Sequence, residues 1–103
     1  MASEAAKLKL LRQFSNPATV RRRAASYLGR NAKIKVSSRR DKKYQVVAPG
    51  GRTVHFGQMG YEDFTKHKDP ARRRSYLARS AGIGGTWARD RYSANNLARR
   101  LLW

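Results

Sequence analysis

Residues 54–74, VHFGQMGYEDFTKHKDPARRR, contain both histidines of the chain, three of its six acidic residues and a run of three arginines. In an enzyme, such a cluster of His, Asp and Glu can bind a metal ion or transfer a proton. In a binding protein, the same residues can form a scaffold that presents the arginines to a partner. The choice between these two roles determines what the protein does.

The spacing of the two histidines gives little support to catalysis. The order of a strand with His55 and a helix after His67 loosely resembles the strand–strand–helix metal fold of His-Asn-His nucleases. Such a site needs ligands on the helix, but the helix expected from Ala71 offers no His, Asp, Glu or Asn. Neither histidine has a partner at an accepted ligand spacing. We therefore expect a protein that is not an enzyme, with no catalytic residue, no metal site and no cofactor, and a metal-dependent nuclease is the least favoured alternative.

The charge of the chain points to a polyanionic partner. The 103 residues include 24 Lys and Arg against 6 Asp and Glu, which gives a net charge of +18. Nucleic acid, with DNA ahead of RNA, is the partner that such an excess favours, and acidic protein surfaces are the alternative. No segment approaches the roughly 20 apolar residues of a membrane span. Without cysteine, there is neither a disulfide nor a thiolate ligand.

The basic runs are the candidate nucleic-acid-binding residues. Nearly all of them lack an acidic residue four positions away that would neutralise them. No base-reading motif is present, so we expect phosphate contacts with little sequence specificity. The aromatic residues between the runs, Trp87 among them, are expected in the core. The candidate binding residues are Arg21, Arg22, Arg23, Arg39, Arg40, Lys42, Lys43, Lys66, Lys68, Arg72, Arg73, Arg74 and Arg79.

The elements that must position these residues indicate a small α+β domain with a three-stranded antiparallel β-meander. Strict alternation at 33–37 and β-rich runs at 44–48 and 52–56 predict the three strands. A polar turn and Pro49-Gly50-Gly51 connect them as hairpins, with Gly51 at positive φ. Gly57 is expected to end the third strand.

Capping signals predict the helices. The first begins near Ser3, the second runs from the Asn16-Pro17 cap to Gly29, and the basic helix runs from the Asp69-Pro70 cap to Gly82. A short last helix starts at Ser93 and places the apolar end of the chain on the core or in a neighbouring molecule. The chain then divides into a basic helical arm at 1–31, a core of meander plus packed basic helix at 32–82, and a flexible link with the C-terminal helix at 83–103.

The cluster around the histidines is interpreted as a structural clasp. Tyr61 and Phe64 are expected to anchor a loop that holds the arginine helix against the sheet. Tyr76 and Leu77 are expected to contact the sheet from that helix. Asp63 and Asp69 are expected to cap helices and to pair with nearby arginines.

The stretch GGRTVHFGQMGYEDFTKHKDPARRRSYLARS resembles a family of small basic proteins encoded by large eukaryotic DNA viruses, of mimivirus-like and chlorella-virus-like lineages. The resemblance covers about residues 43 to 80, and the family is functionally uncharacterised, so it implies a viral setting rather than a chemistry. The residues that match its pattern are Gly51, Arg52, Val54, Phe56, Gly57, Tyr61, Asp63, Thr65, His67, Lys68, Asp69, Arg72, Arg73, Tyr76 and Arg79.

Together these observations predict a virion-associated basic protein that binds nucleic acid through phosphate contacts. The alternative is a minor capsid or internal scaffold protein that cements acidic surfaces of other virion proteins. Either role places the protein in the virion and, during assembly, in the host cytoplasm or nucleus. The oligomeric state and the choice between DNA and RNA stay open.

Overall fold

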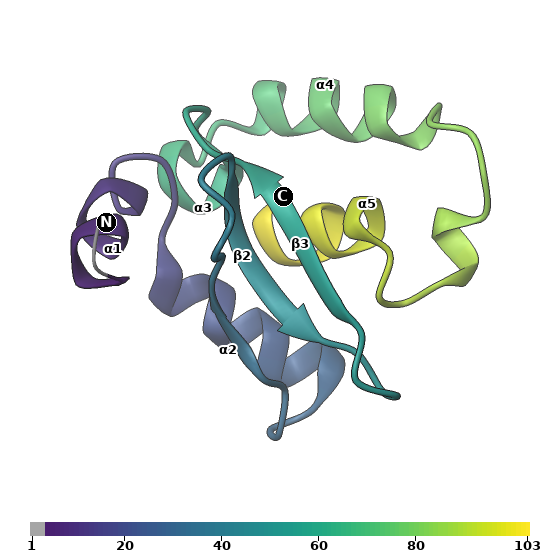
Figure 1. Cartoon of the computed structure of the whole chain (residues 1–103). Helices are drawn as coiled ribbons and strands as arrows, with labels where there is room; N and C mark the ends of the chain where they lie inside the picture. The colour runs from purple at the N-terminus through teal and green to yellow at the C-terminus, as the bar shows by residue number, and fades with distance from the viewer. Residues whose placement is uncertain (1–3) are drawn as a thin grey trace.

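The computed structural model describes residues 4–103 and has the predicted α+β architecture, with five α-helices and one three-stranded antiparallel sheet. Ser3, the expected start of the first helix, lies outside the described residues. Figure 1 shows the sheet in front of the C-terminal helix, with one helix below and another above.

The sheet is the predicted meander, with strand order β1-β2-β3. Tyr44 on the central strand pairs with Val36 on one side and with Phe56 on the other, and all three side chains are buried. On each strand, the side chains one position before and after these residues point to the opposite face of the sheet, because successive side chains alternate between its two faces. The third strand continues past Gly57, its expected end, to Gln58. The strands are β1 (Ile34–Val36), β2 (Lys42–Val47) and β3 (Thr53–Gln58).

The two N-terminal helices are α1 (Glu4–Leu11) and α2 (Pro17–Leu28). The Asn16 side chain accepts a hydrogen bond from the Thr19 amide at 3.3 Å, and Pro17 is the first helical residue, so the predicted cap is confirmed. Gly29, at a φ of 105°, ends the helix as expected.

A short helix that the sequence did not predict, α3 (Phe64–His67), precedes the basic helix α4 (Pro70–Ala81). One turn is too short to leave a helical period in the sequence. Asp63 caps α3 and Asp69 caps α4, the latter by accepting from the Ala71 amide at 2.9 Å. Tyr61 is 70% exposed, so its expected role as a packing anchor is wrong.

Near the C-terminus, a short α-helix continues directly into a π-helical segment, whose turns contain more residues than those of an α-helix. A 3₁₀ turn, η1 (Trp87–Arg89), leads to α5 (Ala94–Leu97), which Ser93 caps, and a π-helical segment, η2 (Ala98–Leu102), follows directly. The Trp103 amide donates to the Ala98 carbonyl at 3.2 Å, a bond that spans five residues.

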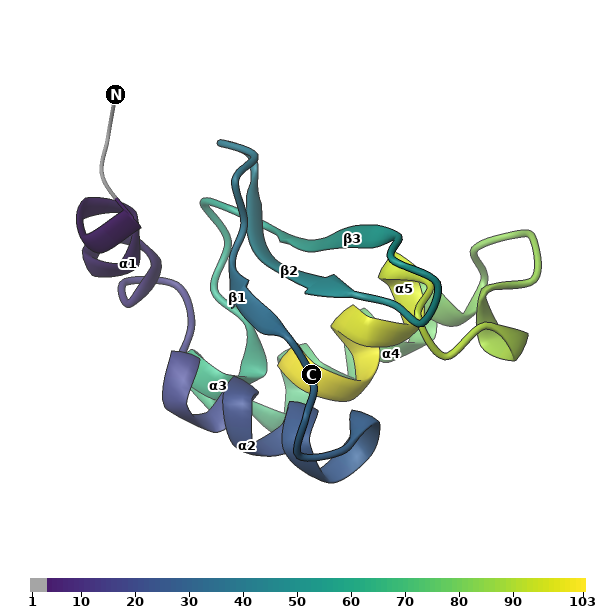
Figure 2. The same cartoon turned by 60° about the horizontal axis from the view of Figure 1, so that its bottom comes forward.

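A single core joins both ends of the chain. Leu11, Val20, Val46, Phe56 and Leu101 belong to the same buried cluster, so it draws on all three of the segments expected from the sequence. Figure 2 shows the layers, with the sheet above and the C-terminal helix and α2 below it. Within residues 4–103, no helix is long and apolar enough to cross a membrane.

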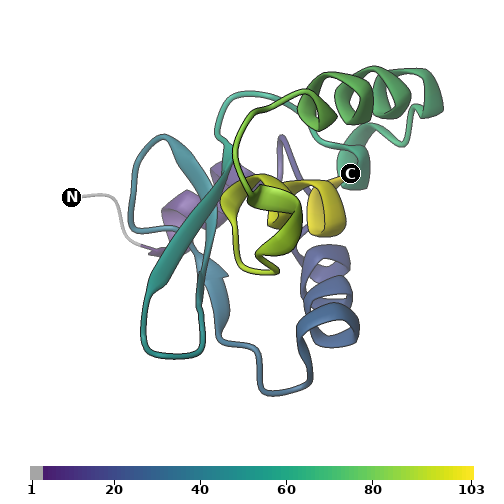
Figure 3. The ribbon, with the colours of Figure 1, turned by 90° about the vertical axis from the view of Figure 1, so that its right-hand side faces the viewer.

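The basic helix α4 is held by the C-terminal segment. The Tyr76 ring stacks on the Trp103 ring, with centroids 4.2 Å apart and planes at 8°. The Arg99 guanidinium donates to the Leu77 carbonyl at 2.7 Å. Figure 3 shows α4 above the C-terminal helix, at its upper right. The expectation that Tyr76 and Leu77 attach α4 to the sheet is therefore corrected, because these two residues meet the C-terminal helix.

Substitutions of two glycines in the meander test the packing of the sheet against the C-terminal helix. Gly51 has the expected positive φ, 95°, and Gly57 has a φ of 82°. Replacing either with Ala imposes a left-handed strain of about 1–2 kcal/mol. In Gly57→Ala the new Cβ would also lie 2.7 Å from Leu102 Cδ1, whereas the space beside Gly51 is open. We expect both variants to lower the free energy of unfolding measured in urea, and Gly57→Ala to lower it more.

The control is Gly84→Ala, because no heavy atom lies within 4 Å of the added Cβ at that position. Its unfolding free energy is expected to change by less than about 0.5 kcal/mol. Equal losses for Gly51→Ala and Gly57→Ala would show that the contact between β3 and Leu102 is looser than described.

Candidate phosphate-binding site

A buried ion pair underlies the candidate site. Lys43 Nζ lies 3.1 Å from Asp63 Oδ2, and the two side chains are 3% and 1% exposed. The ammonium also donates to the carbonyls of Tyr61 and Phe14. Burial lowers the pKa of Lys43 below its ordinary value, and the Asp63 carboxylate offsets part of that shift. Lys43, expected at the nucleic-acid surface, is therefore removed from it.

The second carboxylate oxygen of Asp63 starts a hydrogen-bond chain. It accepts from the amide and the hydroxyl of Thr65, and Thr65 Oγ1 accepts from the Asn16 amide at 2.9 Å. Thr65 Oγ1 lies 3.3 Å from Ser15 Oγ, which accepts from the Tyr44 hydroxyl at 2.8 Å. Burial is the main cause that raises the pKa of Tyr44, so this hydroxyl stays protonated and donates. The chain fixes the start of α2 against α3.

The clasp interpretation needs one correction. Asp63 pairs with a lysine of β2 and not with an arginine. Among the described acidic residues of the 54–74 segment, Glu62 is the one that pairs with an arginine, since it lies 3.3 Å from Arg72 in an exposed contact that contributes little to stability.

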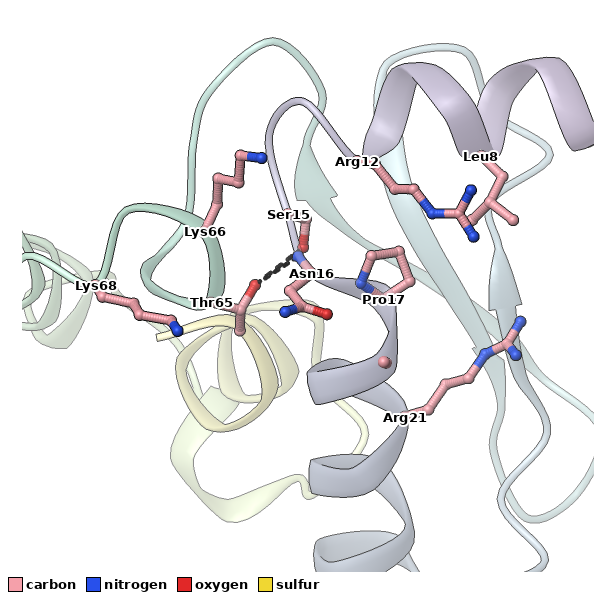
Figure 4. A pocket seen from close by; sticks show the side chains of 10 residues that line it. Leu8, Arg12, Ser15, Asn16, Pro17, Arg21, Thr65, Lys66 and Lys68 are labelled. Atoms are coloured by element: carbon pink, nitrogen blue, oxygen red, sulfur yellow. Dashed lines mark hydrogen bonds between the residues drawn. The ribbon is translucent and has the colours of Figure 1, made fainter.

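A pocket of about 470 Å³ opens above this hydrogen-bond chain. Figure 4 shows it at the point where α2 begins beside α3, with Ser15, Asn16 and Thr65 at its centre. Four basic side chains line it: Arg12 from the turn after α1 and Arg21 from α2 on one side, and Lys66 and Lys68 from α3 and its end on the other (Figure 4).

The described lining of the pocket is basic. Across the described part of the chain, no Asp or Glu lines it. The first turn of the twelve-residue helix α2 adds the partial positive charge of its amide dipoles. Four cations and a helix N-terminus together favour a phosphate group, because their charges are not neutralised within the pocket.

Sequence reasoning found three of these four cations, Arg21, Lys66 and Lys68, and missed Arg12. Arg12 stands outside any basic run. Its position four residues before the Asn16 cap could have identified it, because a basic side chain at that position comes close to the first turn of the following helix.

The remaining predicted binding residues do not form a single surface with this pocket. Arg39 and Arg40 lie exposed in the turn between β1 and β2, and Lys42 is half-buried on β2. Arg22, Arg72 and Arg79 are exposed on α2 and α4. A second groove is lined by Arg23, Arg73 and Arg74.

The two histidines have separate surroundings. His55 Nδ1 lies 2.7 Å from Ser37 Oγ on the sheet, whereas His67 Nδ1 accepts from the Asp69 amide at 2.9 Å. The His67 ring packs 5.1 Å from the Trp103 ring, and its Nε2 is buried without a hydrogen-bond partner. In residues 4–103, no group of three or more His, Cys, Asp or Glu side chains is placed to hold a metal ion.

Comparison with known proteins adds one similarity. Residues 32–80 match a protein family described as a family of unknown function (DUF5754). The match includes Thr65, Lys66 and Lys68 of the pocket, whereas Arg12 and Arg21 lie outside it. No curated protein matches the chain. No solved structure matches it either.

Breaking the buried pair provides a test of the network. Lys43→Met leaves the Asp63 carboxylate buried without its counter-ion, and we expect the free energy of unfolding to fall by about 3–5 kcal/mol. Adding Asp63→Asn removes the unpaired charge and keeps an acceptor for Thr65, so the double variant is expected to regain part of this loss. A double-mutant cycle in urea measures the coupling, and strictly additive effects would contradict the pairing.

The pH dependence of stability tests the surroundings of His67. Burial, and then the nearby Arg72 charge, lower the pKa of His67 below its ordinary value of 6.5. The unfolded chain thus binds the proton more readily, so the unfolding free energy should decrease as the pH falls through about 6.5. Thermal or urea unfolding between about pH 8 and pH 5.5, above the range of ordinary carboxylates, measures this decrease.

The matched variants are His67→Asn and His55→Asn. The pKa of His55 is lowered as well, by burial and then by Arg39, so each histidine contributes its own part of the decrease. We expect His67→Asn, whose amide oxygen can still accept from Asp69, to have a smaller pH dependence than the wild type. A dependence unchanged in that variant would contradict a depressed His67 pKa.

Proposed function

We propose that this protein binds nucleic acid, with DNA as the leading partner, through phosphate contacts with little sequence specificity. The observation that carries the proposal is the pocket at the start of α2, which four basic side chains line without an acidic partner among the described residues that line it. Its proposed setting, a virion, follows from the resemblance to small basic proteins of large DNA viruses.

The chemistry of the pocket suits a phosphate of a chain better than an isolated ion. Its volume of about 470 Å³ falls in the range of small-molecule sites, so it accommodates a phosphate with the adjoining sugar. Arg12 and Arg21 supply planar donors for two oxygens of one phosphate, and Lys66 and Lys68 supply point charges.

The rest of the surface extends such contacts along a polymer. Residues 4–103 contain three ion pairs, one of them buried, so most of the 24 basic residues keep an unneutralised charge. Arg74 and Arg79 on α4 and Arg39 and Arg40 in the β1–β2 turn are exposed. Contacts of this kind position a protein on the backbone and carry no base information.

A role as a minor capsid or scaffold protein has one observation in its favour. Tyr61 and Ile83, 70% and 52% exposed, border a groove of about 790 Å³ between β3 and α4. Exposed tyrosine is typical of protein interfaces. In that role the basic residues would contact acidic surfaces of other virion proteins.

Tyr61→Ser with Ile83→Ser is expected to leave DNA affinity unchanged if the first proposal holds.

The experiment compares two variants that lose the same charge. The pocket variant carries Arg12→Gln, Arg21→Gln, Lys66→Gln and Lys68→Gln. The control carries Arg30→Gln, Lys33→Gln, Lys35→Gln and Arg89→Gln, all at exposed positions outside the pocket. Fluorescence anisotropy of a labelled DNA duplex, titrated at several salt concentrations, gives the affinity and its salt slope.

The pocket variant should lose up to about 0.9 of the slope of log K against log salt for each phosphate contact removed. The control should lose less, and duplexes of unrelated sequence should respond alike. Equal losses in both variants would show that overall charge, and not the pocket, carries binding. Wild-type protein that fails to bind nucleic acid at low salt would overturn the proposal.

A further inference from the structure

A second concave surface is lined by residues of α4 and of the C-terminal helix, which lies below α4 in Figure 3. This groove measures about 940 Å³, with α2 and η1 contributing to its walls. Within residues 4–103, no Asp or Glu lines it. Five arginines do: Arg23, Arg73, Arg74, Arg99 and Arg100.

The groove also contains aromatic rings that sequence reasoning did not place there. Phe64, Trp87 and Trp103 line it, and the latter two are the only tryptophans of the chain. Trp87 was expected in the core, but both indoles are only half-buried. Tyr76 stacks on one face of Trp103 and the Arg99 guanidinium lies over one face of Trp87, so the groove presents the ring surface that these contacts leave exposed. A site for phosphate alone has no need of such rings.

Several of the arginines are held in place by the protein. The Arg99 guanidinium lies 5.0 Å from the centre of the Trp87 ring and donates to the Leu77 carbonyl. Arg73 Nε donates to the Trp103 carbonyl at 2.6 Å. Since these side chains are already ordered, a ligand that contacts them loses less side-chain entropy on binding. Arg74 and Arg100 are exposed at the same groove and available to phosphates.

Rings beside uncompensated arginines match one class of polyanion. In a single strand, the bases are free to stack on aromatic side chains while the phosphates follow the cations. In a duplex, both faces of each base are covered by its neighbours, so rings in a groove gain nothing from them. Acidic protein surfaces offer carboxylates but no flat faces to stack on Trp87 or Trp103.

We propose that the groove between α4 and the C-terminal helix binds a single-stranded segment of nucleic acid, with bases stacked on Trp87 and Trp103 and phosphates on Arg74 and Arg100. The inference rests on the proposed function and deepens it, because it names the form of nucleic acid that this second site takes. The pocket at the start of α2 contacts phosphates of either form.

Intrinsic tryptophan fluorescence reports on this groove alone, since both indoles of the chain line it. The probes are a short oligothymidylate, an abasic oligomer with the same number of phosphates, and a hairpin duplex. We expect the oligothymidylate to quench the fluorescence and to bind about tenfold more tightly than the abasic oligomer. Equal affinity for these two probes without quenching would overturn the inference.

Matched variants connect the signal to the residues. Arg74→Gln with Arg100→Gln removes two groove charges, and Arg30→Gln with Arg89→Gln removes two exposed charges elsewhere. The groove pair should weaken oligothymidylate binding more than the control pair, with a smaller difference for the duplex. Equal effects of the two pairs on oligothymidylate would overturn the assignment.

Trp87→Leu removes a stacking ring, and thermal melting checks its fold because Trp87 Nε1 donates to the Ile83 carbonyl at 2.8 Å. A folded variant should lose about tenfold in affinity for oligothymidylate and keep its affinity for the abasic oligomer. If this variant does not fold, the arginine pairs decide the question.

The outcomes separate this inference from the proposed function. Duplex and abasic binding without quenching or single-strand preference would overturn the groove site and leave phosphate binding intact. Absence of binding to every probe would overturn both. Quenching by polyglutamate as strong as that by oligothymidylate would assign the groove to an acidic protein partner instead.

Discussion

Lys43 and Asp63 are charged groups in an interior that disfavours charge, and their contact constrains much of the surrounding structure. Each needs the other, and each needs further hydrogen bonds to replace water. The carbonyls of Phe14 and Tyr61 and the amide of Thr65 provide them. Since Lys43 lies on β2, Phe14 in the link between α1 and α2, and Tyr61 and Asp63 in the loop that leads to α3, the pair holds three parts of the chain in one arrangement. Such pairs contribute more to a defined geometry than to net stability.

This arrangement explains why the basic residues remain available. The chain has six acidic residues, and four of them are engaged by nearby groups. Asp63 is taken up by the interior, Asp69 caps α4, and Glu62 and Asp90 pair at the surface with Arg72 and Arg52. Few carboxylates are left to neutralise the cations around the start of α2 or along α4. Both the pocket at the start of α2 and the groove beside α4 are therefore lined by basic residues and, among the described residues, by no acidic one.

Local signals account for what could be predicted from the sequence. The caps at Asn16, Asp69 and Ser93 and the Pro49-Gly50-Gly51 turn act within a few residues, and the structure contains all of them. The burial of Lys43 left no such signal, because its partner lies on a different element and lysine in a basic run is typical of a surface. Position 43 falls on the strand face opposite to Tyr44, which only the tertiary structure shows to be covered. For the same reason, the sequence did not indicate that Arg12 lines the pocket or that Trp87 lines the groove, because both placements depend on how distant segments pack.

The closure of the core by the last helix has a consequence for how the protein folds. Leu11 and Val20 near one end of the chain pack in the same cluster as Leu97, Leu101 and Leu102 near the other. Contacts between segments so far apart in sequence require large loops to close, which slows folding. On the ribosome, the sheet and α2 must wait for residues 94–102 before their apolar faces are covered. Until then these apolar faces stay uncovered on a strongly basic chain, so polyanions in the cell can compete with its own C-terminal helix for the nascent chain.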